Sequence, residues 1–310
     1  MDRRSFLSSV SCSLTSLAIP VHSLLDQAST PQDKGSPVIT DGGCWLEVAA
    51  PFIVEDAELG LQCEIVLTSD TFSGISGHAD GKAASDYEIH LFDASGKAVG
   101  VDGVARRMTV PAMRTTVIPV RELIGDAKKF FGGMKIRLRP HGSDQLSQMA
   151  HVGDLFSSAF VRWRTPASFD NVHANPDPLQ WQNVDGYFYS MPFPSLGEYE
   201  CVFSLFNPNN ARSAGEIRLY DPLGKTFVRQ RYELKPHASL LFDLNAGAVI
   251  ADPWQTTQKV SMSEAGQNQS GLLAVVNEQG TAKSFGYLMI RQRPQKRFSV
   301  EHPIHQSVFN

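Results

Sequence analysis

The chain has 310 residues, of which 42% are hydrophobic and 19% charged, so it can form two domains of ordinary size. This composition excludes collagen-like, coiled-coil and disordered proteins. The 28 basic and 32 acidic side chains give a net charge of −4, with no overall positive field to attract a phosphate backbone. We therefore expect no nucleic acid partner, and the absence of a long uncharged apolar run argues against stable membrane insertion.

The first 28 residues have the features of an export signal. Arg3 and Arg4 are followed by Phe6 and Leu7, and then by an uncharged, serine-rich, weakly apolar stretch, residues 8–25. This pattern predicts a twin-arginine signal over residues 1–28 and a periplasmic or extracellular location. The alternative is an ordinary basic N-terminus, which leaves the uncharged stretch unexplained.

Cysteines are few for an oxidising compartment. Once the signal with Cys12 is removed, Cys44, Cys63 and Cys201 remain, an odd number with no close pair. We expect neither a disulfide framework nor a cage of the Cys-x-x-Cys type. Cys63 and Cys201 lie among apolar residues and are predicted to be small core residues.

The second part of the chain repeats the first. Residues 88–97 (EIHLFDASGK) match residues 216–225 (EIRLYDPLGK), and residues 159–166 (AFVRWRTP) match residues 287–294 (YLMIRQRP), both at an offset of 128. Residues 62–67 match residues 200–205 at the larger offset of 138. The difference predicts an insertion of ten residues in the Gly/Ser/Asp-rich stretch 69–85.

Both copies have the pattern of β-strands. Apolar and polar residues alternate in residues 88–91 and 216–219, and the Asp-x-x-Gly segments 93–96 and 221–224 predict hairpin turns. A helix of one or two turns is expected in residues 121–131, because the glycines at 125, 132 and 133 limit its length. Further strands are expected at residues 63–68, 108–110, 115–120, 135–139, 158–164, 201–206, 226–234, 239–244, 271–277 and 285–291.

We therefore predict an all-β protein of two tandem antiparallel β-sandwich domains related by internal duplication. The first repeat is expected at residues 43–166 and the second at residues 184–296. A proline-containing linker, residues 167–183, is expected between them, and a C-terminal tail at residues 297–310.

Three segments in the first repeat resemble a known family. They are the Trp-led start at Cys44 and Trp45, the hairpin ending in Gly96 and Lys97, and residues 108–115 (MTVPAMRT). In this order they resemble the sensory rhodopsin transducer family, whose wider superfamily is regarded as small-molecule-binding, sugar-related β-sandwiches. The second copy is more diverged. The resemblance implies a binding role and self-association, but an exported chain cannot couple to a cytoplasmic photoreceptor.

Aromatic and arginine side chains are the predicted ligand-binding groups. Trp45 and Tyr187 hold corresponding positions, and flat rings of this kind stack on sugars, while arginines bind hydroxyls and carboxylates. Trp163, Trp181 and Tyr189 are further aromatic candidates, although large aromatics in a sandwich commonly fill the core. The predicted ligand-binding residues are Trp45, Tyr187, Arg162, Arg164, Arg291 and Arg293.

Catalytic and metal-binding signals are weak. No nucleophile elbow, P-loop, dinucleotide fingerprint or His-Glu-x-x-His motif occurs, and we expect no cofactor. His302 and His305 could share a metal ion with a carboxylate such as Glu301 or Asp170, but only two ligands stand together, and solvated histidines in a tail are the simpler interpretation.

These observations favour an exported, non-enzymatic protein that binds a small polar ligand, such as a carbohydrate or sugar acid, at a repeat or subunit junction. Two alternatives remain. The first is a scaffold module that binds another exported protein. The second, weaker one is a metal-dependent enzyme built around His302 and His305.

Overall fold

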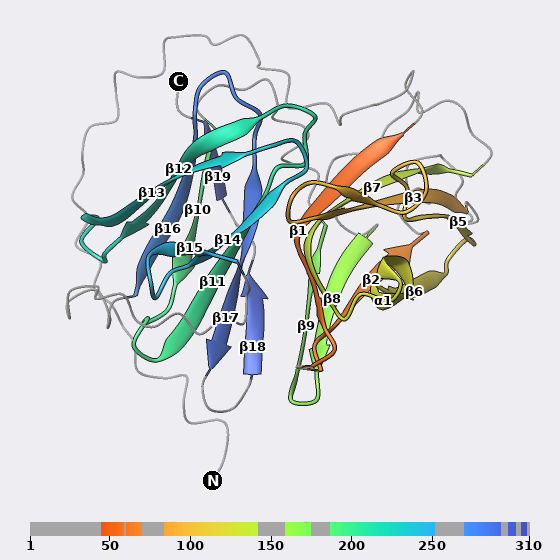
Figure 1. The fold of residues 1–310 in the computed structure, drawn as a ribbon, viewed down its shortest axis with the longest axis horizontal. Coiled ribbons are helices and arrows are strands. Elements are labelled where there is room, and N and C mark those ends of the chain that lie inside the picture. Colours follow the sequence, from red (N-terminus) through yellow and green to blue (C-terminus); the bar gives the residue numbers. More distant parts are fainter. Residues whose placement is uncertain are drawn as a thin grey trace, which may run out of the picture. The chain divides into compact units, whose positions relative to one another are not determined.

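The protein is all-β in its computed structural model (Figure 1). The structure describes residues 45–58, 60–69, 84–141, 159–174, 187–251, 270–292, 297–301 and 305–308, which lie within one compact unit, residues 35–310. Of residues 140, 187–189 and 305–308 it describes the backbone only. No helix in the described part of the chain is long and apolar enough to span a membrane.

Residues 45–174, here called the first half, form two antiparallel sheets. One has the order β1-β7-β3-β4, with β5 also paired to β3, and the other has the order β6-β2-β8-β9. The elements are β1 (Leu46–Asp56), β2 (Gln62–Thr68), β3 (Ser85–Asp93), β4 (Ala98–Val99), β5 (Arg106–Val110), β6 (Thr115–Pro119), α1 (Arg121–Ile124), β7 (Lys129–Pro140), β8 (Ala159–Thr165) and β9 (Ser168–His173).

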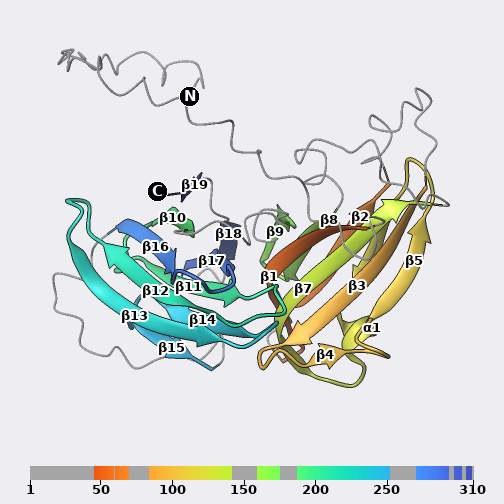
Figure 2. The ribbon, with the colours of Figure 1, turned by 90° about the horizontal axis from the view of Figure 1, so that it is seen from above.

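Residues 187–308, the second half, also form two antiparallel sheets (Figure 2). Their orders are β13-β12-β16-β10-β19 and β15-β14-β11-β17-β18. The strands are β10 (Tyr187–Phe193), β11 (Tyr199–Phe206), β12 (Ser213–Tyr220), β13 (Thr226–Leu234), β14 (Ser239–Asp243), β15 (Ala248–Ile250), β16 (Gly271–Asn277), β17 (Phe285–Gln292), β18 (Arg297–Glu301) and β19 (His305–Val308).

The two halves have the same strand order. In the first sheet of each half, β1 corresponds to β10, β7 to β16, β3 to β12, and β4 with β5 to β13. With this correspondence the two sheets have the same order of neighbouring strands. Pairing β6, β2, β8 and β9 with β14, β11, β17 and β18 matches the second sheets in the same way. In this pairing, β15 and β19 have no counterpart among the described strands of the first half. Sixteen residues separate β2 from β3 and six separate β11 from β12, a difference of ten residues.

The two predicted hairpins are confirmed, and they share one hydrogen-bond pattern. In the first, Asp93 Oδ1 accepts the N–H groups of Ser95 at 2.9 Å and Lys97 at 3.0 Å, and Gly96 N donates to Asp93 O. In the second, Asp221 Oδ1 accepts those of Leu223 at 2.9 Å and Lys225 at 2.8 Å, and Gly224 N donates to Asp221 O. The Asp carboxylate therefore holds the turn in both halves, as Asx-turn chemistry predicts.

The hydrophobic core is continuous between the halves. β1 is buried along its whole length, because it packs on β2 and β8 of its own half and on β11 and β17 of the other. Ser204 Oγ donates to Pro51 O at 2.6 Å, and Tyr287 Oη donates to His173 O at 2.7 Å. Buried residues of both halves therefore belong to one cluster.

Two boundary predictions need correction. Ser168–His173, expected in the linker, is strand β9, and its Asp170 Oδ2 accepts the N–H of Val300 at 2.6 Å. The expected tail contains β18 and β19, which pair with β17 and β10. The short helix expected within residues 121–131 is α1, which is four residues long and is followed by Gly125.

Gly132 and Gly133, two of the glycines expected to limit the helix, lie inside β7, where each faces a close neighbour. A Cβ atom at Gly132 would overlap the carbonyl oxygen of Phe92, and one at Gly133 would overlap the Phe206 ring.

Candidate functional site

The predicted ligand-binding residues lie on different sheets. Trp45 immediately precedes β1, and Arg137 and Arg139 place their guanidinium carbons 5.1 and 4.4 Å from its ring centre. Tyr187 begins β10 in another sheet, and its side chain lies outside the described atoms. The structure therefore does not bring the two corresponding aromatic positions onto one sheet.

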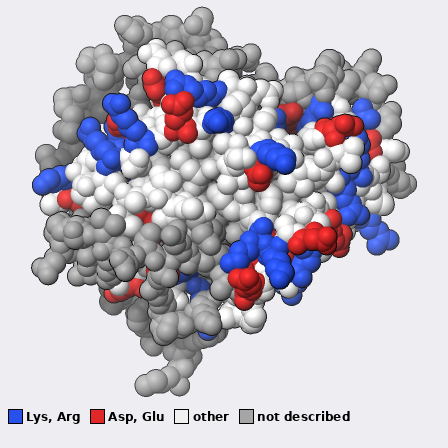
Figure 3. All heavy atoms as spheres, viewed as in Figure 1, with Lys and Arg blue, Asp and Glu red and all other residues white. Residues whose placement is uncertain are grey.

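The predicted arginines have acidic partners. Arg162 and Arg164 on β8 each lie 3.3 Å from Glu64, and Arg162 also stacks on Phe169. Arg291 on β17 lies 3.2 Å from Glu200. Arg293 lies outside the described residues. On the face drawn in Figure 3, basic and acidic side chains lie next to one another in the same way.

Other predicted candidates are core residues or lie outside the description. Trp163 is fully buried, and its Nε1 donates to Phe52 O at 3.1 Å, so its ring does not offer a face to a ligand. Cys63 and Cys201 are buried free thiols, and burial raises the pKa of both, that of Cys201 to about 12. Trp181 and His302 lie outside the described residues, as do the side chains of Tyr189 and His305.

No group of three metal-ligating side chains occurs among the described residues. Asp170, named as a possible metal ligand, is bound to the backbone of β18.

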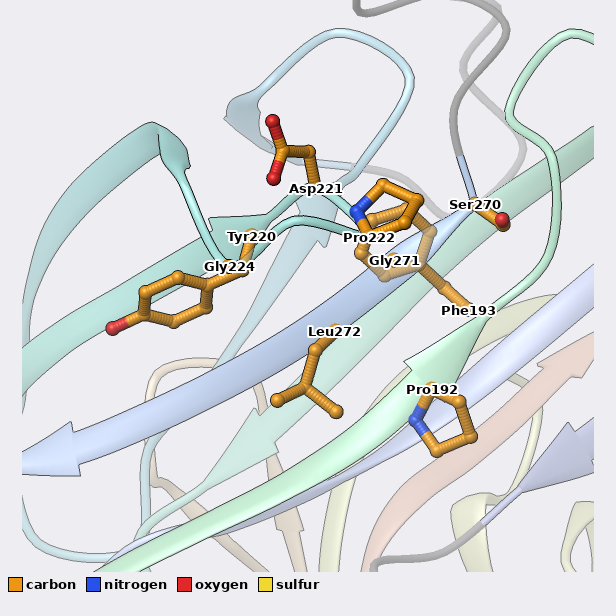
Figure 4. A pocket seen from close by; sticks show the side chains of 9 residues that line it. All are labelled: Pro192, Phe193, Tyr220, Asp221, Pro222, Gly224, Ser270, Gly271 and Leu272. Carbon is orange, nitrogen blue, oxygen red and sulfur yellow. The ribbon is translucent and has the colours of Figure 1, made fainter. Parts of the chain in front are cut away.

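The structure has a pocket of about 560 Å³ in the second half, which sequence reasoning missed (Figure 4). It lies where β10 ends, β12 turns into β13, and β16 begins. None of the six predicted ligand-binding residues lines it. The lining residues are Pro192, Phe193, Tyr220, Asp221, Pro222, Gly224, Ser270, Gly271 and Leu272.

The register of the sheet explains the apolar side of the pocket. Leu272 pairs with Pro192 on one side and Tyr220 on the other, so these three side chains form one cross-strand row on the same face. Leu272 is 38% exposed, whereas Phe193 on the opposite face is buried. Gly271 lets the strands approach closely, because a Cβ atom there would overlap the Tyr220 carbonyl oxygen.

Polar groups lie at the turn end of the pocket. Asp221 Oδ1 is engaged by the two turn N–H groups, while the carboxylate as a whole lies at the upper rim in Figure 4. A hydrogen bond with Tyr220, supported by the Glu216 carboxylate 2.7 Å away, raises the pKa of Arg218 beside the pocket. The pocket thus combines an apolar row with a single carboxylate among its lining residues.

The first half has a surface in the corresponding place, and that surface is covered. Strand order and register match Phe92 and Gly133 with Tyr220 and Leu272. The Phe206 ring lies directly on Gly133, and His237 stacks on Phe92 with ring centres 4.2 Å apart.

The backbone completes this covered contact. Ser239 N donates to Ala94 O at 3.0 Å, and the Pro236 carbonyl packs against Gly96 in the hairpin turn. The end of β11 and the turn 235–239 of the second half therefore occupy, on the first half, the place that is an open pocket on the second.

Comparisons with known proteins give no family. No family model and no curated protein matches the chain. Among solved structures, it is similar to a Bacteroides uniformis β-glucuronidase 2 covalently bound to cyclophellitol-6-carboxylate aziridine, at 10% identity and a TM-score of 0.20, over 86% of this chain and 26% of that one. A glycosyl hydrolase family 2 member from Bacteroides cellulosilyticus matches at 10% identity and a TM-score of 0.20, over 83% and 26%. The chain spans about a quarter of these structures.

Proposed function

We propose that this chain is an exported, non-catalytic binding protein made of two β-sandwich halves that arose by duplication. The pocket of the second half is its binding site, and it holds a polypeptide turn of a partner protein. The observation that carries this proposal is the corresponding surface of the first half, which already holds such a turn, residues 235–239, through an aromatic stack and a backbone hydrogen bond.

Duplication is supported by the common strand order, the identical hairpin hydrogen bonds and a further matched bond. Val120 N donates to Cys63 O at 2.8 Å, and Leu244 N donates to Cys201 O at 2.9 Å. The resemblance to sensory rhodopsin transducers belongs to the same proposal. Its hairpin itself takes part in the contact between the halves, and its residues 108–115 include the counterpart of the turn 235–239, which makes the other side of that contact. Export is supported by the twin-arginine pattern alone.

A small ligand is the second candidate, and the size of the pocket favours it. Ligand sites commonly have volumes of about 300 to 1,000 Å³ and combine apolar surface with a few polar groups. Because the charged side chain lining the pocket is Asp221, a neutral sugar suits it better than a sugar acid.

The two candidates are separated by a binding experiment. The peptide probe is a fluorescently labelled cyclic peptide of residues 110–116, which contain the turn between β5 and β6, the first-half counterpart of the turn 235–239. This peptide and a panel of neutral sugars and sugar acids are titrated into the protein and into Leu272→Arg. The proposal expects the peptide to bind by anisotropy, and the substitution to weaken binding at least about tenfold by placing a cation on the apolar row. Sugar binding sensitive to Leu272→Arg would favour the second candidate. If neither probe gives a signal that responds to Leu272→Arg, the pocket is not a binding site.

A further inference from the structure

We infer that the partner turn is supplied by a second copy of this chain, so that copies associate head to tail; this rests on the proposed function. The turn between β5 and β6, residues 111–115, is the first-half counterpart of the turn 235–239. Residues 111–115 are here called the tip. In each copy the pocket of the second half would receive the tip of another copy.

The tip has the same backbone as the turn that covers the first half. Arg114 N donates to Pro111 O at 3.1 Å, and Ala238 N donates to Lys235 O at 3.1 Å. Met113 has φ 54° and His237 has φ 60°, two non-glycine residues in the left-handed region at corresponding positions. The two turns also join β2 and β11 alike, because Ser69 N donates to Arg114 O and Asn207 N donates to Ala238 O.

The tip is exposed where its counterpart is covered. Met113 is 68% exposed, and Arg114 and Thr115 are exposed as well, whereas Ala238 and Ser239 are buried against the first half. The chain therefore presents one uncovered tip and one uncovered pocket that correspond to the two sides of an existing contact.

Side-chain volumes are complementary across the proposed contact. In the contact between the halves, the large side chain of Phe206 lies on Gly133. In the proposed contact between chains, the larger Leu272 takes the place of Gly133, and register places the smaller Thr68 at the position of Phe206. The large and small partners are thus exchanged, which keeps the summed volume similar.

The remaining groups fit in the same orientation. Met113 corresponds to His237 and would lie on Tyr220, giving a sulfur–aromatic contact in place of the stack on Phe92. Thr115 N would meet Pro222 O as Ser239 N meets Ala94 O. Arg114 would lie against the turn that carries Asp221, and this pair has opposite charges.

Such a contact uses different surfaces on the two copies. A heterologous contact of this kind closes into a ring if the rotation permits, and otherwise continues as an open chain. It also predicts that each copy can lose one side of the contact and keep the other.

Sedimentation of the signal-free protein tests the inference with two variants. Met113→Asp removes the apolar tip, and Asp is tolerated at positive φ, so the turn keeps its conformation. Leu272→Arg blocks the pocket. We expect the wild type to associate at concentrations up to about 100 µM. Each variant should raise the protein concentration at which half of the chains are associated at least about tenfold. Val101→Asp, at a side chain 79% exposed elsewhere on the first half, is the matched control and should associate like the wild type.

A mixture of the two variants is the sharpest readout. Leu272→Arg retains an intact tip and Met113→Asp an intact pocket, so the mixture should form a one-to-one complex at a concentration at which neither variant associates alone. A monomeric wild type, association unaffected by either variant, or a mixture without complex would each overturn the inference. If the wild type is monomeric but binds the peptide, the inference is wrong and the proposed function stands. If the wild type neither associates nor binds the peptide, both the inference and the proposed function are wrong.

Discussion

At the scale of single residues, the two halves use different side chains to accept the backbone N–H of corresponding cysteines, Cys63 and Cys201. The N–H of Cys63 donates to Glu55 Oε2 at 2.6 Å, and Arg121 Nη2 lies 2.7 Å from the other carboxylate oxygen. The corresponding N–H of Cys201 donates to Asn245 Oδ1 at 2.8 Å. Arg121 and Asn245 follow the matched residues Val120 and Leu244, so one neutral amide in the second half replaces an ion pair in the first.

Glu55→Ala is expected to destabilise the protein by about 1 to 3 kcal/mol, because the buried N–H of Cys63 loses its acceptor. Arg121→Ala is the control. Its side chain is 49% exposed, and Glu55 keeps the N–H of Cys63 as a partner, so its removal should cost less than Glu55→Ala. Urea unfolding measures both, and equal losses would mean that the carboxylate acts mainly through Arg121.

His237 makes the contact between the halves sensitive to acid. Burial lowers its pKa to about 4, and Lys135 and His90 on the facing sheet act in the same direction. A hydrogen bond to the backbone of Pro208 opposes them. Since the folded state holds fewer protons than the unfolded state between the ordinary pKa of about 6.5 and 4, stability contributed by neutral His237 is complete above pH 6.5 and is lost as the pH falls toward 4.

We expect His237→Asn to flatten the stability profile in this window, because Asn tolerates the positive φ and does not titrate. Met113→Asn, at the corresponding position of the other half, tests the backbone effect alone and should leave the slope unchanged. Denaturant midpoints measured from pH 4 to 7 provide the readout. An unchanged slope in His237→Asn would assign the pH dependence to other groups such as His90, whose pKa burial also lowers.

At the scale of elements, the hairpin turns show how the same sequence signal serves two environments. Gly96 and Gly224 both have positive φ, at 88° and 80°. Around Gly224 nothing lies within 4 Å of the position of a Cβ atom, whereas at Gly96 a Cβ atom would overlap the Pro236 carbonyl oxygen of the other half. The sequence motif is shared, but only one of the two turns is packed.

This difference gives a matched pair of substitutions. Gly224→Ala should cost about 1 to 2 kcal/mol, the strain of a left-handed alanine. Gly96→Ala carries the same strain and must also displace the turn 235–239, so its loss of stability should be clearly larger. Thermal or urea unfolding of both variants measures the difference. Equal losses of stability in the two variants would show that displacing the turn 235–239 costs no stability.

The elements were largely predictable, whereas the site was not. Period-2 alternation and the Asp-x-x-Gly turns identified the strands and both hairpins, because these signals are local. The match of residues 159–166 with 287–294 was off by one, since the register pairs Cys63 with Trp163 and Cys201 with Ile290. One residue reverses the face of a strand. The pocket depends on residues that turn and register bring together from three strands, and no local motif marks that arrangement.

At the scale of the whole molecule, stability depends on the contact between the halves. β1 has no solvent-exposed residue, and the core cluster includes residues of both halves, so neither half buries its apolar surface alone. The sequence predicted two tandem β-sandwich domains, but the two halves share one hydrophobic core. We expect a single cooperative unfolding transition in which far-ultraviolet circular dichroism and tryptophan fluorescence coincide.

Substitutions at Phe206 and Gly133, which touch across the contact between the halves, test this contact directly. Gly133→Leu places in the first half the residue that the second half carries at the same position, and it should overpack against Phe206. We expect a large loss of stability and separation of the two optical transitions as the halves uncouple. Phe206→Thr alone should also destabilise, because it leaves a cavity over Gly133.

The double variant, Gly133→Leu with Phe206→Thr, copies the Leu272 and Thr68 pair of the proposed contact between chains. If volume complementarity governs both contacts, the double variant should be more stable than the sum of the single losses predicts, with a coupling of about 0.5 to 3 kcal/mol. Additive losses would mean that leucine and threonine do not fit together in this geometry. That result would weaken the head-to-tail contact at the same time, because it depends on the same exchange.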